Sequence, residues 1–66
     1  MPYTFGALYE RFTNGVPQLS YLDKEYGESG TLRQGDIFRF VGENNDRRVT
    51  YWEYDNSKDE LYVELG

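Results

Sequence analysis

The chain contains neither cysteine nor histidine, and its 66 residues are close to the lower size limit for folding by packing alone. Without cysteine no disulfide can form, and the common zinc sites need cysteine or histidine ligands. The fold must therefore be stabilised by apolar side chains. Twelve aromatic residues can supply much of that area, because each buries roughly 150–250 Å². We expect one small globular domain over residues 1–66.

Charge is distributed unevenly along the chain. The net charge is −5, and residues 51–66 alone hold five acidic side chains against one lysine. An acidic surface repels nucleic acids and membranes and suits a partner with a basic surface, although it also serves ordinary solubility. No apolar segment has transmembrane length, and the first residues lack the pattern of a signal peptide. We expect a cytoplasmic protein with no membrane partner.

The second half of the chain contains three β-like runs, which predict a three-stranded antiparallel meander. Residues 36–41, 47–54 and 60–65 are separated by GENND and DNSKD, whose residues favour turns. The last run alternates strictly between apolar and polar side chains, as a half-buried strand does.

Strand alternation also predicts which side chains are buried. After the Gly35-Asp36 turn it would place Arg39 in solvent, and in the run 47–54 it would turn Val49 and Tyr51 inward. The predicted core consists of Phe5, Leu8, Phe38, Phe40, Leu61, Val63 and Leu65.

The first half of the chain fits two interpretations. Phe5, Leu8, Tyr9 and Phe12 form a helical stripe with Thr4 as a possible N-cap, and SYLDKEYG (20–27) could be a second short helix. In the competing interpretation, Asn14-Gly15 joins two strands as a hairpin, with Pro17 on an edge strand. We favour the hairpin.

Four short segments resemble, in order, the landmarks of an SH3 domain: ALYE (7–10), QLSY (18–21), GTLRQGDIFRF (30–40) and LYVEL (61–65). The resemblance implies an all-β fold, a small SH3-like barrel that includes the C-terminal meander. The proline-peptide groove of that family is not implied, because YWEY (51–54) replaces its tryptophan pair. The alternative is an α+β fold with one or two short N-terminal helices packed on the meander.

The sequence predicts no enzyme, no cofactor and no metal site. A nucleophilic site needs a base, and without histidine the serines have only carboxylates and lysines available. The turn DNSKDE (55–60) offers oxygen ligands at alternate positions, but Glu60 stands where a calcium loop requires glycine.

Surplus aromatic residues instead predict a non-enzymatic protein-binding module. Tyrosine, tryptophan and arginine dominate binding hot spots, and a small core does not need all twelve aromatics. The predicted partner-binding patch consists of Trp52, Tyr54, Tyr62, Arg48, Glu53 and Glu64. It combines an aromatic surface with acidic charge, for a protein partner that has a basic surface.

The size and acidity of the chain resemble those of small phage proteins that inhibit host enzymes, so inhibition of a partner enzyme is one form of this function. The alternative, ranked second, is a small β-barrel that binds single-stranded nucleic acid. There the exposed aromatics would stack on bases beside Arg47 and Arg48. The oligomeric state is left open.

Overall fold

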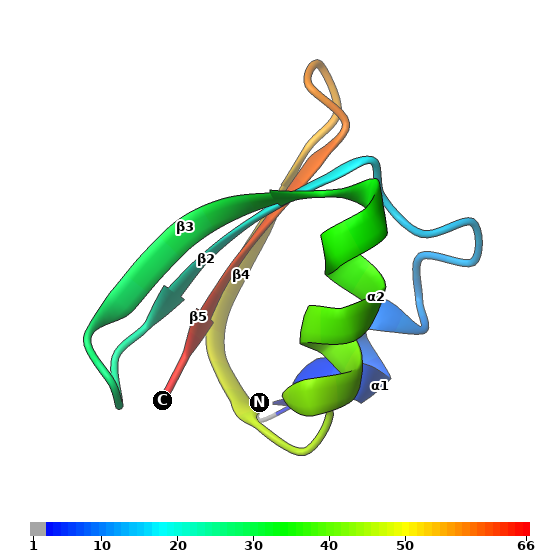
Figure 1. The fold of residues 1–66 in the computed structure, drawn as a ribbon. Helices are drawn as coiled ribbons and strands as arrows, with labels where there is room; N and C mark the ends of the chain where they lie inside the picture. Colours follow the sequence, from blue (N-terminus) through cyan, green and yellow to red (C-terminus); the bar gives the residue numbers. More distant parts are fainter. Residues whose placement is uncertain (1–2) are drawn as a thin grey trace.

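The structure, a computed structural model, describes residues 3–66 as a five-stranded sheet with two helices against one of its faces (Figure 1). Along the chain the elements are β1 (Tyr3–Thr4), α1 (Phe5–Tyr9), β2 (Gln18–Asp23), β3 (Glu28–Arg33), α2 (Gln34–Glu43), β4 (Arg48–Asp55) and β5 (Glu60–Leu65). Neither α1 nor α2 is long and apolar enough to cross a membrane, and no other helix occurs in residues 3–66.

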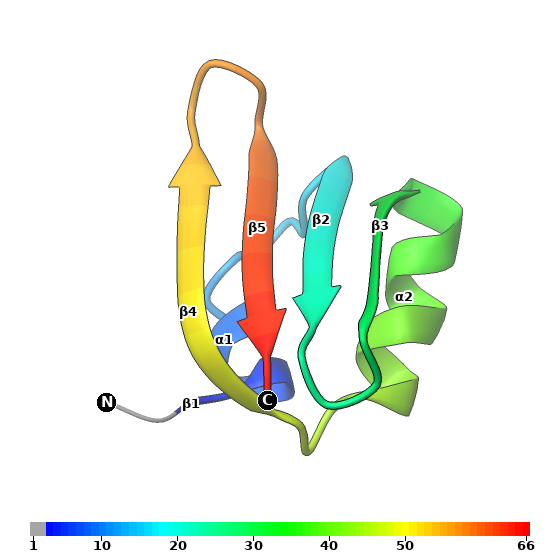
Figure 2. The ribbon, with the colours of Figure 1, turned by 90° about the vertical axis from the view of Figure 1, so that its left-hand side faces the viewer.

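The strands lie side by side in the order β1-β4-β5-β2-β3, as Figure 2 shows for all but the short β1. Two antiparallel hairpins, β2–β3 and β4–β5, meet where β5 runs parallel to β2. The predominantly β prediction is confirmed. The sheet stays open, with β1 and β3 at its edges, and does not close into the SH3-like barrel.

The predicted hairpin across residues 7–22 is wrong, and the helical alternative holds for its first part. The Thr4 Oγ1 accepts a hydrogen bond from the Ala7 N–H at 3.2 Å, so Thr4 is the N-cap of α1. Glycine suits position 6 of this helix because the segment at Asn45 packs directly against the helix backbone there. A Cβ at Gly6 would collide with the Asn45 side chain, and the Gly6 N–H donates to the Asn45 carbonyl at 3.0 Å.

Asn14-Gly15 does form a turn, in which Gly15 has a φ of +71°, but this turn leads into β2 without joining two paired strands. The true N-terminal hairpin is β2–β3, and Gly27 lies in its turn with a φ of +67°. Residues 20–27 are therefore not the second short helix. Leu19, Tyr21 and Asp23 alternate along β2 and face the helices.

The run 36–41 is helical, so the three-stranded meander is also wrong. Ile37, Phe40 and Val41 lie at i, i+3 and i+4, and this spacing turns them together toward the sheet. Ile37 is buried and Phe40 stacks on Tyr21 with ring centroids 4.5 Å apart. Phe38, predicted in the core, is 72% exposed on the opposite side of α2. Arg39 is exposed, as predicted, although on a helix.

One apolar cluster lies between the sheet and the helices. It consists of Phe5, Leu8, Val16, Leu19, Ile37, Val49, Leu61, Val63 and Leu65. The prediction was therefore correct for five of its seven core residues, while Phe40 is only half-buried and Phe38 is exposed.

Candidate protein-binding face

A one-residue irregularity in β4 decides which aromatic side chains face the helices. Val49 pairs with Leu65, but the next pair is Tyr51 with Glu64, so a bulge lies between Val49 and Tyr51. Such a bulge reverses the alternation of every later residue of the strand. Val49 is buried, as predicted. Tyr51, predicted inside, instead points away from the helices and is 46% exposed.

Beyond the bulge, the side chains of the β4–β5 hairpin divide between the two faces of the sheet. Directly paired residues share a face, so the pairs Tyr51–Glu64, Glu53–Tyr62 and Asp55–Glu60 all lie opposite the helices. We name this surface the outer face; it consists of Tyr51, Glu53, Asp55, Glu60, Tyr62 and Glu64. Figure 2 looks on to it, and no described helix lies in front of the strands there.

Two tyrosines form the centre of the outer face. The rings of Tyr51 and Tyr62 meet edge to face with centroids 6.2 Å apart. The Tyr51 hydroxyl donates to Glu53 at 2.9 Å, and the Tyr62 hydroxyl donates to Glu64 at 2.8 Å. These hydrogen bonds to carboxylates raise the pKa of both tyrosines above the ordinary value. Each ring therefore lies beside an acid, with its hydroxyl as the donor to that acid.

The acids at the other end of the outer face are also held in their charged form. Glu60 accepts hydrogen bonds from the side chains of Ser20 and Gln18, which lower the pKa of its carboxyl. The Asp55 pKa is lowered chiefly by the hydrogen bond from the Ser57 hydroxyl. Hydrogen bonds to a carboxylate favour its ionised state. This end of the face is therefore a stable negative surface.

Trp52 and Tyr54, placed on the predicted patch, lie on the inner side of the sheet. Trp52 pairs with Val63 and Tyr54 with Leu61, both of which are buried core residues. Trp52 is nevertheless 39% exposed, and it meets the Phe12 ring in an edge-to-face pair with 6.4 Å between ring centroids. Of the predicted patch, the structure brings Tyr62, Glu53 and Glu64 together with Tyr51 and separates Trp52 and Tyr54 from them.

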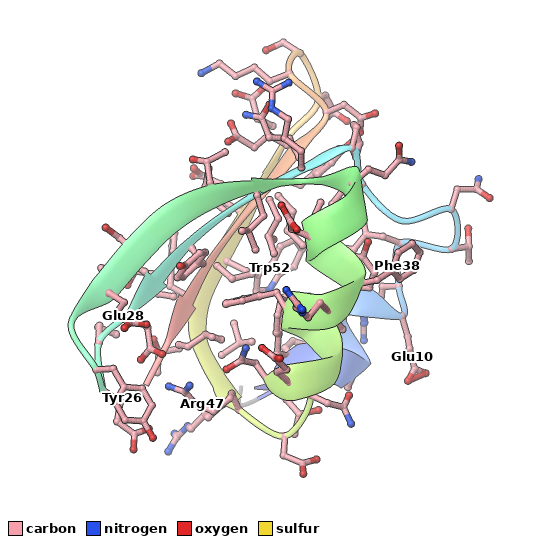
Figure 3. All side chains as sticks on the ribbon, viewed as in Figure 1. Glu10, Tyr26, Glu28, Phe38, Arg47 and Trp52 are labelled. Carbon is pink, nitrogen blue, oxygen red and sulfur yellow. The ribbon has the colours of Figure 1, made fainter. Side chains whose placement is uncertain are left out.

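The two adjacent arginines have different environments. Arg47 forms an ion pair with Asp23 at 2.8 Å, and its guanidinium lies over the Tyr26 ring at 5.2 Å (Figure 3). Arg48 begins β4, where its backbone pairs with Thr4, and it is exposed. The Arg47 guanidinium is engaged by Asp23 and Tyr26, whereas Arg48 is the exposed member of the pair.

A separate hollow of about 500 Å³ lies between the segment after α1 and helix α2. It is lined by Tyr9, Glu10, Phe12, Thr13, Asn14, Gly15 and Phe38. Figure 3 shows Phe38 and Glu10 on this side of the molecule, away from the outer face. Its lining includes one carboxylate and no basic side chain, so it offers no acid–base pair. Within residues 3–66 no group of three or more carboxylates is arranged to hold a metal ion.

Comparison of the chain with protein-family models, with curated proteins and with solved structures gives no match. The function is therefore argued from the geometry of the outer face and its surroundings.

Proposed function

We propose that the chain is a non-enzymatic protein-binding module that uses the outer face. The observation that carries this proposal is the Tyr51–Tyr62 pair, in which Tyr51 is exposed and Tyr62 half-buried, on a sheet face that also carries four carboxylates. Tyrosine is enriched at the centres of interfaces because its ring contributes apolar area and its hydroxyl contributes a polar contact. A partner of matching chemistry presents apolar groups to the rings and basic side chains to the acids around them.

The carboxylates give this binding its charge preference. The four carboxylates of the outer face have two lysines near them: Lys58 in the turn beside Asp55 and Glu60, and Lys24 at 3.6 Å from Glu64. Complementary charge speeds association and excludes partners of like charge more than it adds affinity. A module of this kind would act by covering a basic surface, and if the partner is an enzyme with a basic active-site groove, the result is inhibition. The cytoplasm remains the proposed location.

Affinity capture with the immobilised chain tests the proposal. The double variant Tyr51→Ala/Tyr62→Ala should lose a partner that the unmodified chain captures. The control is Phe38→Ala, which removes a more exposed aromatic beside the hollow. Urea unfolding of each variant confirms that the fold is retained. If Phe38→Ala loses the partner and the double variant still captures it, the binding site is the hollow and not the outer face.

Salt dependence separates the two components of the same interaction. Raising the salt concentration from about 0.1 M to 1 M shortens the Debye length from roughly 10 Å to 3 Å and weakens the charge contribution. We expect binding to weaken but persist, because the tyrosine contacts are not screened. If binding is lost completely at high salt and Tyr51→Ala/Tyr62→Ala has no effect, the outer face binds its partner through charge alone.

A further inference from the structure

Strand β4 has an open edge beside the outer face. Strand β5 pairs with β4 on one side from Val49 to Asp55. On its other side, among residues 3–66, only β1 pairs with it, through Tyr3 opposite Val49 and Thr4 opposite Arg48. The segment Trp52–Asp55 therefore has no described strand along this side. Alternate residues of an edge strand direct their N–H and C=O groups outward, and such groups can pair with another chain.

The side chains of this segment specify what an added strand must carry. Glu53 and Asp55 lie on the outer face, so the residues opposite them in an added strand would lie there too. Basic side chains at those positions would meet two acids. Trp52 and Tyr54 lie on the inner side, with Trp52 partly exposed. Apolar side chains at the intervening positions would cover them. The fitting strand alternates basic and apolar residues.

The other edge of the sheet, strand β3, lacks alternating acidic and aromatic side chains. Strand β3 carries Glu28 at one end and Arg33 at the other, with Ser29, Gly30, Thr31 and Leu32 between them. It has no aromatic side chain and no excess of one charge, so it selects no particular strand. The preference for a basic and apolar segment is confined to β4.

A second copy of β4 does not fit its own edge. In antiparallel pairs of identical strands centred on Glu53 or on Tyr54, directly opposite residues share a face, so Glu53 would meet Glu53 or Asp55 of the other copy. A register centred on Trp52 would set Glu53 opposite Tyr51, but it would bring Asp55 to Val49, which β1 already pairs. Like charges placed directly opposite destabilise a strand pair. The acids therefore oppose self-association through this edge and favour a basic segment.

We propose that β4 is a strand-addition site for an extended segment of a partner protein in which basic and apolar residues alternate. This inference rests on the proposed function, because Tyr51, Glu53 and Asp55 belong to both the outer face and the edge. The added strand would extend the sheet beyond β4. Its backbone would supply the affinity and its basic side chains the selectivity.

Nuclear magnetic resonance with a defined peptide tests the site directly. The probe is a capped eight-residue peptide that alternates lysine and valine, added to the full chain. We expect shifts of the β4 amides of Trp52–Asp55, with slower hydrogen exchange for those that point away from β5. Amides of β3 should not change. Absence of any change in β4 at millimolar peptide would overturn the proposal.

Two control peptides isolate the backbone contribution. A peptide with four lysines followed by four valines has the same composition without the alternation. A second peptide keeps the alternation but carries N-methyl groups on alternate amides along one edge. Losing two or more backbone hydrogen bonds should weaken binding at least about tenfold. If all three peptides bind equally and no β4 amide gains protection, strand addition is wrong.

The variants distinguish this proposal from the proposed function. The double variant Glu53→Lys/Asp55→Lys should no longer bind the lysine–valine peptide. It should instead bind a peptide in which glutamate and valine alternate. Glu28→Lys/Glu43→Lys changes the net charge equally on exposed residues elsewhere and should bind as the unmodified chain does. A partner lost with Tyr51→Ala/Tyr62→Ala, without protection of β4, would overturn strand addition and leave the outer face as the site. Peptide protection of β4 that survives Tyr51→Ala/Tyr62→Ala would support strand addition and show that the acids of the outer face, and not its tyrosines, bind the added strand.

Discussion

The guanidinium of Arg47 holds both carboxylate oxygens of Asp23, with Nη1 3.0 Å from Oδ2 and Nη2 2.8 Å from Oδ1. Asp23 is buried and also accepts the backbone N–H groups of Glu25 and Tyr26 in the turn that follows β2. Arg47 immediately precedes β4. The pair therefore fixes the β2–β3 turn against the segment that leads from α2 into β4.

Arg47→Ala should lower the free energy of unfolding by about 2–4 kcal/mol, because it leaves a buried carboxylate without its cation. Arg48→Ala, at the neighbouring exposed position, should change it by less than about 0.5 kcal/mol. Urea unfolding of the two variants measures the difference. Equal effects would mean that the Asp23 pair does not stabilise the fold.

Acid should weaken the fold partly through Asp23. Its pKa is lowered below the ordinary value, chiefly by the hydrogen bond from Arg47. A carboxyl with a depressed folded-state pKa stabilises the fold above its unfolded pKa of about 3.9, and this contribution is lost as the pH falls through the folded value. Glu60, whose pKa is also lowered, acts in the same direction.

The urea midpoint of the unmodified chain should therefore fall as the pH is lowered from about 5 to 2. In Arg47→Ala the fall should be smaller, because the main cause of the Asp23 shift is gone. A fall of the same size in both proteins would place the acid sensitivity in other carboxyls, such as Glu60.

Two adjacent residues of α2 test the helical assignment of residues 34–43. Ile37 is buried and Phe38 is 72% exposed. Ile37→Ala should cost about 2–5 kcal/mol of stability because it opens a cavity in the core. Phe38→Ala should stay within about 0.5 kcal/mol. Urea unfolding of the two variants measures these losses of stability. If residues 36–41 formed a strand that buried Phe38, Phe38→Ala would cost more than Ile37→Ala.

Trp52 should report its partly covered position in fluorescence. Its emission maximum should lie between those of a buried and a fully hydrated indole, since Trp52 is 39% exposed and packs against Phe12. Phe12→Ala should shift the emission to longer wavelength and cost about 1–3 kcal/mol, because Phe12 pairs with both Trp52 and Tyr54. Trp52→Ala should leave a folded protein. An unchanged spectrum in Phe12→Ala would contradict the contact.

The sequence correctly predicted the elements whose signals lie within a few neighbouring residues. The strict alternation of residues 60–65 identifies β5 and its buried side chains, and Thr4 marks the start of α1. The segment containing Ile37, Phe38, Phe40 and Val41 satisfies both a strand and a helix pattern. Ile37 is buried and Val41 partly buried, while Phe38 is exposed; this outcome comes from packing on the sheet and cannot be predicted from the spacing alone.

The candidate site was only half predictable for a similar reason. The aromatic and acidic residues of 51–64 indicate a binding surface, but the bulge before Tyr51 has no glycine or proline to mark it. One extra residue moves Tyr51 outward and Trp52 inward. The Asp23–Arg47 pair joins residues 24 positions apart, so no local pattern indicates it.

The parallel pairing of β2 with β5 has a consequence for how the chain reaches this structure. Each hairpin closes a short loop and can form early, whereas Gln18 and Glu60, paired across the junction, are 42 positions apart. Contacts of such sequence separation form slowly, because the intervening chain must first be ordered. We therefore expect the joining of the two hairpins to limit the folding rate. Substitutions at Leu19 or Leu61, which meet at the junction, should slow folding more than those confined to either turn.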